Sequence, residues 1–200
     1  MQNWNRFPRF ILALSLLIVL CAGLFAPRVD EARALPLLAC PGGIITEWTF
    51  SNVTTPTIGA GNFTNGTGIT PSFAADAAGN VLSAISFTGW AATFDPNDYV
   101  EFSADTTLNT DISISFDYRS TGAGPSNLDL QYSADGISFT SYTITTLNRD
   151  STFHNLFFDL SLISVINNNA NTKFRVYGYG ASGGNLRLDN LTISETCPTD

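Results

Sequence analysis

The sequence predicts an all-β fold, a two-sheet antiparallel jelly-roll sandwich preceded by a cleaved signal peptide, and three observations lead to this prediction. Polar and apolar residues alternate along residues 111–119 and again along residues 127–133, which is the pattern of strands with one buried and one wet face. Other short apolar segments are separated by turns rich in Gly, Pro and Asn. The sequence shows no repeat, heptad or long amphipathic helix, so two packed sheets are favoured over a parallel α/β sheet.

Residues 111–145 are the centre of this prediction. The apolar face of their first strand consists of Ile112, Ile114, Phe116 and Tyr118. An Ala-Asp-Gly turn follows the second strand, and the third strand is expected to start at Ile137. The alternation slips near Thr140, where a β-bulge would keep Tyr142 and Ile144 in the buried row. We expect the three strands to pair as one antiparallel meander, whose apolar face needs a second sheet to cover it.

The remaining strands are short. They are expected at residues 44–50, 81–87, 99–103, 153–160, 173–179 and 186–194. Residues 54–72 are rich in Gly, Thr, Asn and Pro and cannot build a core. A connection of this length is usually a functional loop or contains a short strand. Residues 160–166 indicate a turn of helix.

The N-terminus has the order of a secretory signal. Arg6 and Arg9 precede an apolar run at residues 10–26, and an Ala-Arg-Ala cleavage motif follows. This order predicts export, with residues 1–34 as the signal peptide and residues 35–200 as a single mature domain. The apolar run is near the lower length limit for a membrane span, so an uncleaved anchor is the alternative.

The charge balance excludes some partners. The whole chain has a net charge of −8. Removal of the signal peptide leaves five basic and fifteen acidic residues, a net charge of −10. Such a surface repels nucleic-acid phosphates and anionic lipid headgroups, so we expect no nucleic-acid partner and, after signal cleavage, no membrane contact. It is compatible with secretion and with bound Ca²⁺.

Two cysteines remain in the mature chain, one near each end. In an oxidising compartment Cys40 and Cys197 are expected to form a disulfide. Closing so long a loop would stabilise the fold by about 5 kcal/mol in the chain-entropy model. Two free thiols are the alternative.

Two stretches resemble known modules. The sequence YVEF at residues 99–102, followed by ISFDYRSTGAGPSNLDLQYSADGISF at residues 114–139, resembles exported bacterial surface modules. The ending RLDNLTI at residues 187–193 is similar to the closing strand of carbohydrate-binding-module-like jelly rolls. The resemblance implies an extracellular β-sandwich. It also implies that Asp189 could help to bind a structural calcium beside the first strand, near Glu47.

Few residues suit catalysis. The only histidine, His154, lies in an apolar strand segment, where a place on one strand face is a better interpretation than a catalytic base. A zinc site would need several His or Cys ligands. A glycosidase needs two carboxylates on opposite sides of a cleft, and the acidic residues considered for this role are Asp95, Asp98, Glu101 and Asp117. We predict surface solvation for these carboxylates, and no enzyme activity.

Calcium is the one cofactor that the sequence suggests. Asp95, Asn97 and Asp98 place three oxygen-bearing side chains in a four-residue turn, and hard cations take such ligands. Asp189 with Glu47 is the second candidate site. The alternative in both places is a turn or capping carboxylate that makes local hydrogen bonds.

A possible glycan site lies in residues 173–179. Arg175, Tyr177 and Tyr179 share one face of this strand, and aromatic rings beside polar groups can stack on the C–H surfaces of sugars. Trp90, between a glycine and two alanines, is either exposed at a loop as a further ligand contact or buried in the core. For Trp48 we expect a core position.

The sequence therefore predicts a secreted, non-catalytic binding or adhesion module. The leading partner is an extracellular polysaccharide or surface glycan. A structural protein of the cell envelope or matrix is the first alternative, and an extracellular glycoside hydrolase that uses paired carboxylates is the second.

Overall fold

The computed structural model describes residues 43–75 and 83–195. All of these residues belong to one compact unit that spans Cys40–Asp200. The predicted signal peptide and both cysteines of the predicted disulfide, Cys40 and Cys197, lie outside the described residues.

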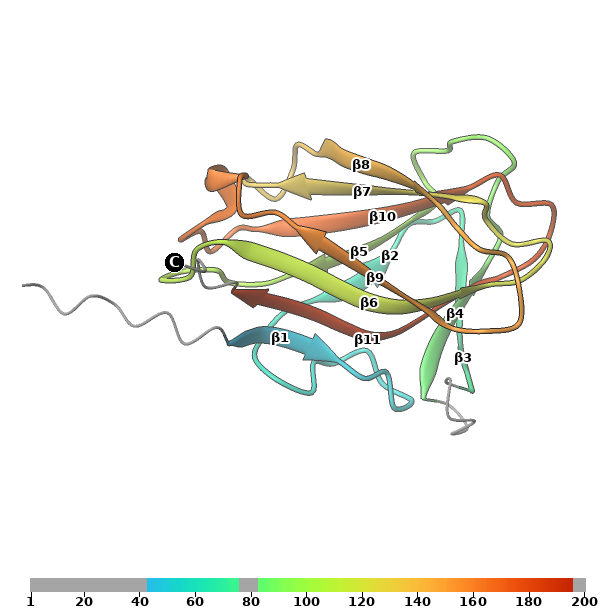
Figure 1. Cartoon of the computed structure of the whole chain (residues 1–200), viewed down its shortest axis with the longest axis horizontal. Coiled ribbons are helices and arrows are strands. Elements are labelled where there is room, and N and C mark those ends of the chain that lie inside the picture. The colour runs from blue at the N-terminus through green and yellow to red at the C-terminus, as the bar shows by residue number, and fades with distance from the viewer. Residues whose placement is uncertain (1–42, 76–82, 196–200) are drawn as a thin grey trace, which may run out of the picture. The chain divides into compact units, whose positions relative to one another are not determined.

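The described residues form two antiparallel sheets that pack face to face (Figure 1). In order, the larger sheet contains β3 (Thr70–Ala74), β4 (Ala84–Thr88), β11 (Leu186–Glu195), β6 (Ile112–Ser120) and β9 (His154–Asp159), and β1 (Ile44–Trp48) pairs with β11. The five-stranded sheet contains β2 (Phe63–Asn65), β5 (Tyr99–Ser103), β10 (Lys173–Tyr179), β7 (Asn127–Ser133) and β8 (Thr140–Thr146). The predicted all-β sandwich is confirmed.

The connectivity from β4 onward is that of a jelly roll. Its eight strands are divided into β4-β11-β6-β9 in one sheet and β5-β10-β7-β8 in the other, so the chain crosses repeatedly between the sheets. The first and last strands are neighbours, with Glu47 of β1 opposite Thr192 of β11. β11 lies inside its sheet, and β10 lies inside the other sheet between β5 and β7.

The core fills the space between the sheets. The predicted apolar row of β6 is buried, with Ile112, Ile114 and Phe116 at 0% exposure and Tyr118 at 3%. The five-stranded sheet contributes the facing rows, which include Val100, Phe102, Leu128, Leu130, Phe174 and Val176. Burial of both rows removes apolar surface from water, which is the main force that holds the two sheets together.

The predicted three-strand meander is wrong, because β6 belongs to the six-stranded sheet whereas β7 and β8 belong to the other. The Gly-Pro loop after β6 carries the chain across the sandwich. The buried hydroxyl of Ser120 donates to the carbonyl of Pro125 at 2.7 Å, and Thr121 N donates to the carbonyl of Asn185 at 3.0 Å. Packed sheets lie only about 10 Å apart, so a loop of this length is long enough to change sheets.

The third strand of the predicted meander also differs in detail. β8 begins at Thr140, and Ile137 precedes it at 82% exposure. The predicted bulge is present: the pairing with β7 skips Tyr142, which packs against the core. Ile144, however, is 61% exposed, because it pairs with Asp129, a residue of the outward row.

The low-complexity segment at residues 54–72 contains β2 and the start of β3, so the short-strand alternative holds there. β3 lies at the edge of its sheet and includes Pro71, a residue that edge positions tolerate. The expected turn of helix is the three-residue 3₁₀ helix Ser164–Ile166. In the part of the chain that the structure describes, no helix is long and apolar enough to span a bilayer.

A buried threonine joins two loops at the end of the sandwich where β10 begins. Thr106 is 0% exposed, and its hydroxyl lies 2.6 Å from the carbonyl oxygen of Ile166 and 2.9 Å from that of Asn169. The same hydroxyl accepts a hydrogen bond from Asn169 N at 3.1 Å. These contacts fix the loop that leads into Lys173, the first residue of β10.

Replacing Thr106 by Val should lower the free energy of unfolding by about 1–3 kcal/mol, because buried backbone groups lose their partner. Urea denaturation measures this change. Thr107→Val is the matched control, since Thr107 is exposed, and we expect it to stay within about 0.5 kcal/mol of the wild type. Equal effects of the two substitutions would contradict the assigned role of Thr106.

Candidate functional site

The outer face of β10 carries the residues predicted to bind a ligand. Phe174 and Val176 are 0% exposed and face the core, so Arg175, Tyr177 and Tyr179 lie on the opposite face of the sheet, as the alternation predicts. β5 and β7 flank β10, and their outward residues lie beside these three. The candidate site is this outward surface of the five-stranded sheet.

Arg175 is fixed at the centre of this surface. Its guanidinium carbon lies 3.9 Å from the ring centroid of Tyr99 and 3.8 Å from that of Phe139, so it is stacked between two aromatic rings. Its Nε donates to Glu101 at 2.8 Å, and its Nη1 donates to the Tyr177 hydroxyl at 3.2 Å. Burial lowers the pKa of Arg175, but the hydrogen bonds to Tyr177 and Glu101 outweigh it and raise that pKa above its ordinary value.

Glu101 holds a second cation as well. Lys173 Nζ lies 3.1 Å from Glu101 Oε1, whereas Arg175 binds Oε2. One carboxylate therefore orders two basic side chains of β10. Both pairs are partly shielded, since the side chain of Glu101 is 16% exposed.

The aromatic part of the surface differs from the prediction in one respect. Tyr177 faces outward but is only 4% exposed, because Phe94 and Tyr99 cover it at centroid distances of 5.0 and 5.5 Å. Phe94 is 50% exposed and also contacts Tyr179, edge to face, at 6.3 Å. The ring available to a ligand is therefore that of Phe94, beside the half-buried Tyr179.

Sequence reasoning missed Phe94, which lies in the loop between β4 and β5 and belongs to no alternating row. Phe139 was missed for another reason: the expected third strand, starting at Ile137, would place it in a buried row. It lies instead just before β8 and covers Arg175 from the other side. Only the tertiary fold brings these loops over β10.

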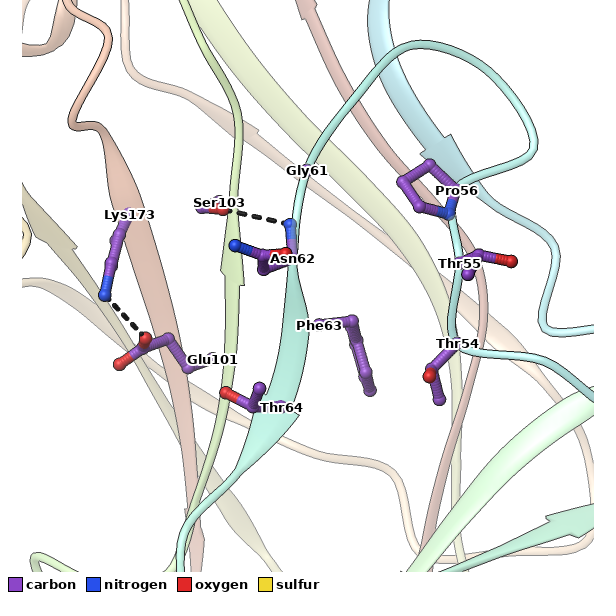
Figure 2. Close-up of a pocket in the computed structure, with 10 residues that line it drawn as sticks. All are labelled: Thr54, Thr55, Pro56, Gly61, Asn62, Phe63, Thr64, Glu101, Ser103 and Lys173. Carbon is purple, nitrogen blue, oxygen red and sulfur yellow. Dashed lines mark hydrogen bonds and ion pairs between the residues drawn. The ribbon is translucent and has the colours of Figure 1, made fainter.

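Two hollows lie at the end of this surface where β10 begins. The first has a volume of about 340 Å³. It lies between the segment Thr54–Pro56 and the strands β2 and β5 (Figure 2). Its lining includes Phe63, Glu101 and Lys173. Ser103 Oγ accepts a hydrogen bond from Asn62 N at 3.0 Å and so joins the two strands of its wall.

The second hollow, of about 280 Å³, continues past Lys173. It shares Asn62, Ser103 and Lys173 with the first and is closed by Asp135 and Asn171 on neighbouring loops. The two hollows have mixed polar and apolar walls, and Lys173 lies on the wall that they share. Together with the rings farther along β10, they form an extended polar and aromatic surface.

Trp90 lies in the core, which resolves the two alternatives for this residue. It is 5% exposed, its Nε1 donates to the carbonyl of Phe87 at 3.0 Å, and its ring lies edge to face with the ring of Phe87. The ring also contacts β10 from inside, since a Cβ atom at Gly178 would lie 2.8 Å from Trp90. The expectation that Trp90 is exposed to a ligand is therefore wrong. Trp48, at 0% exposure, is in the core as expected.

The residues of the first calcium candidate make local hydrogen bonds. Asp95 Oδ1 accepts from Asn97 N at 2.8 Å, and Asp98 Oδ2 accepts from Ala91 N at 2.8 Å. Burial, with a smaller contribution from the charge of Asp95, raises the pKa of Asp98. These local hydrogen bonds are what the turn or capping interpretation predicts.

The second candidate combines residues of adjacent strands. Glu47 is half-buried in β1, and Asp189 is 5% exposed in β11 and accepts a hydrogen bond from Asn190 N at 2.8 Å. Among the described residues, no group of three or more His, Cys, Asp or Glu side chains gathers in one place. Calcium binding at either place stays a prediction.

The carboxylates considered for hydrolysis do not face one cleft. Glu101 and Asp117 lie on the outer faces of opposite sheets, and Asp98 is 3% exposed. His154 is at the start of β9, where its Nε2 contacts Asp150 at 2.9 Å. This solvent-exposed pair fits the strand-face interpretation of His154 rather than a nucleophilic site.

Comparison with known proteins gives structural neighbours only. No protein-family model and no curated protein matches the chain. Among solved structures, the CBM22-1–GH10 modules of endo-1,4-beta-D-xylanase 10B from Clostridium thermocellum, complexed with xylohexaose, match at a TM-score of 0.55 and 11% identity. That match covers 80% of this chain and 29% of the other.

Two further matches are single modules. The CBM22-1 xylan-binding domain from Paenibacillus barcinonensis matches at a TM-score of 0.51 and 17% identity, over 80% of this chain and 99% of that one. The C-terminal family 22 carbohydrate-binding module of the Clostridium thermocellum xylanase matches at 0.52 and 11%, over 79% and 96%. These likenesses confirm the carbohydrate-binding-module-like fold that the closing strand suggests.

The loop that closes the second hollow should make stability depend on pH. Asp135 accepts hydrogen bonds from Ser138 N at 2.7 Å and Ile137 N at 2.8 Å, and these lower its pKa strongly. The ionised form is thus favoured in the folded state, and its contribution is present above the unfolded-state pKa of about 3.9 and is lost as the pH falls below it. Asp135→Asn removes the titrating group.

We therefore expect the melting temperature of the wild type to exceed that of Asp135→Asn at pH 7, and the difference to shrink as the pH falls from 5 to 3. Thermal unfolding monitored by circular dichroism measures both values. A difference that stays constant over this range would show that the carboxylate charge is not the cause.

Proposed function

We propose that this chain is a secreted, non-catalytic module that binds a polysaccharide on the outer face of its five-stranded sheet. The observation that carries the proposal is the ordered aromatic and charged surface, in which the half-exposed Phe94 lies over Tyr177 beside Tyr179. Arg175 is stacked between two rings in the same surface. One neighbour of the same fold is a xylan-binding domain, which makes xylan the first ligand to test.

The physical basis is the match between this surface and a sugar chain. A pyranose ring presents apolar C–H faces and equatorial hydroxyls, so it needs an aromatic ring for stacking and fixed polar groups for hydrogen bonds. Phe94 and Tyr179 supply the rings, and Lys173 with the neighbouring hollows supplies polar groups. Because Glu101 and the aromatic contacts already hold the basic side chains, little conformational entropy is lost on binding.

A structural role in the envelope or matrix, without a small ligand, is the alternative from a different class. It would need neither an exposed aromatic ring nor polar hollows on this sheet face. The hydrolase alternative is disfavoured because Asp98 is buried and Glu101 is paired with two cations. A general acid has to reach the glycosidic oxygen within hydrogen-bond distance.

Replacing Phe94 or Tyr179 by Ala should weaken polysaccharide binding about tenfold or more, which corresponds to about 1.4 kcal/mol. Affinity gel electrophoresis on xylan and other neutral polysaccharides, followed by calorimetry on the best ligand, measures this effect. Phe157→Ala is the matched control, because Phe157 is similarly exposed (59%) but lies in β9, on the other sheet.

Retention of binding by both Phe94→Ala and Tyr179→Ala would exclude this surface as the site. Absence of binding to every polysaccharide would favour the structural role. Turnover of a chromogenic glycoside that is lost in Asp95→Asn would support the hydrolase alternative.

We also propose that the mature protein is exported and that it binds a structural calcium ion at Asp189 and Glu47. The support for export is the signal-like N-terminus, and the support for calcium is the position of these two residues on the paired strands β11 and β1. Detection of residue 35 as the N-terminus of the secreted protein would test the first proposal.

Millimolar Ca²⁺ should raise the melting temperature by a few degrees relative to EDTA, because a ligand that binds only the folded state stabilises it. Differential scanning calorimetry measures this shift. The double variant Asp189→Asn, Glu47→Gln should show none. A wild type that melts at the same temperature in both buffers would refute calcium binding.

A further inference from the structure

Two arginines lie directly opposite each other on the outer face of the six-stranded sheet. Arg119 of β6 and Arg187 of β11 are cross-strand partners in the antiparallel ladder. Their neighbours Tyr118 and Leu188 are buried at 3% and 0% exposure, so both arginines face away from the core. The backbone of a third arginine, Arg149, pairs with that of Ser120 beside them.

These two arginines lack the acidic partner that the basic residues of β10 have. Lys173 and Arg175 share Glu101, whereas within residues 43–75 and 83–195 neither Arg119 nor Arg187 forms an ion pair. The Nε atom of each is buried without a hydrogen-bond partner. Arg187 donates one hydrogen bond, from Nη1 to the carbonyl of Ala75 at 3.0 Å.

The pairing is unfavourable for the protein alone. Like charges directly opposite in a sheet destabilise it, and buried N–H donors without partners cost further free energy. Burial, and secondarily the charge of Arg119, lower the pKa of Arg187. A protein with a net charge of −8 has many carboxylates, yet none pairs with these guanidinium groups among the described residues.

Among the described residues of this ladder, the next outward pair is acidic, with Asp117 opposite Asp189. Asp117 accepts hydrogen bonds from Asn155 Nδ2 at 3.0 Å and from Asn190 Nδ2 at 2.9 Å. Asp189 accepts one from Asn190 N at 2.8 Å. Diagonal neighbours in a sheet lie about 7–8 Å apart, so these carboxylates offset part of the repulsion without satisfying the donors.

We propose that Arg119 and Arg187 form a binding site for an oxyanion, a sulfate or carboxylate group that is either free or carried by a polysaccharide. Two guanidinium groups side by side present several N–H donors in planar forks, which match the oxygens of such groups. The anion offsets the repulsion between the two guanidinium groups. The site is on the sheet opposite to the proposed glycan surface and does not depend on it.

The test uses inorganic sulfate with the full protein. In about 10 mM sodium sulfate, compared with sodium chloride at equal ionic strength, the wild-type melting temperature should rise by about 3–6 °C, as expected for an anion at roughly ten times its Kd. Arg119→Gln and Arg187→Gln should abolish the rise. Arg149→Gln is the matched control, because it removes the same charge from an exposed arginine nearby, and it should keep the rise.

In chloride alone, Arg119→Gln should be at least as stable as the wild type, because it removes the repulsion. A marked loss of stability there would assign the arginines a structural role and overturn the proposal, as would an equal sulfate response in all the variants. Dextran sulfate and polygalacturonate, with neutral dextran as reference, distinguish the sources. Binding of these polymers that requires Arg119 assigns a polysaccharide-borne anion, and a response to inorganic sulfate alone assigns a free one.

Discussion

Each central strand of the sandwich must bury one row of side chains, and this requirement determines what its other row presents to solvent. In β10, burial of Phe174 and Val176 places Arg175 and Tyr177 on the opposite side. In β11, burial of Leu186 and Leu188 does the same for Arg187. A residue on such a row cannot turn inward without shifting the register of the whole strand. Packing of the inward residues in the core therefore fixes the positions of the outward residues, although the outward residues are not part of the core themselves.

The two sheets use their outward rows differently. On the five-stranded sheet Lys173 and Arg175 share Glu101, and Arg175 is enclosed by two rings, so the surface is ordered and part of its positive charge is compensated. On the six-stranded sheet the arginines have no acidic contact among the described residues. The same fold thus offers one surface suited to neutral ligands and another suited to negative groups.

The sequence was sufficient to predict the features that depend on the alternation of polar and apolar residues within one strand. The bounds of β5 and β10 agree with the predicted ranges, and the apolar row of β6 is buried as expected. The alternation could not reveal which sheet a strand joins, because the period of two is identical in both sheets. β6 and β7 were therefore predicted to be neighbours, although the loop between them crosses the sandwich.

The candidate site was predicted only in part, for a related reason. Arg175 and Tyr179 lie in an alternating strand, but Phe94 and Phe139 lie in loops, and only the tertiary fold brings them over β10. Exposure of an aromatic residue was equally hard to predict. Trp90 fills the core because Gly178 leaves room for its ring on the inner side of β10.

The contact between Trp90 and Gly178 has a consequence for how binding strength can vary. Gly178 is the inward residue between Tyr177 and Tyr179, and the indole rests against it where any larger side chain would collide. The position of the outer tyrosines is thus set from behind, by a residue that no ligand touches. A substitution that changes the side-chain volume at Trp90 would therefore move the end of β10. Ligand affinity can change in this way through a substitution in the core, although no residue of the outer surface is replaced.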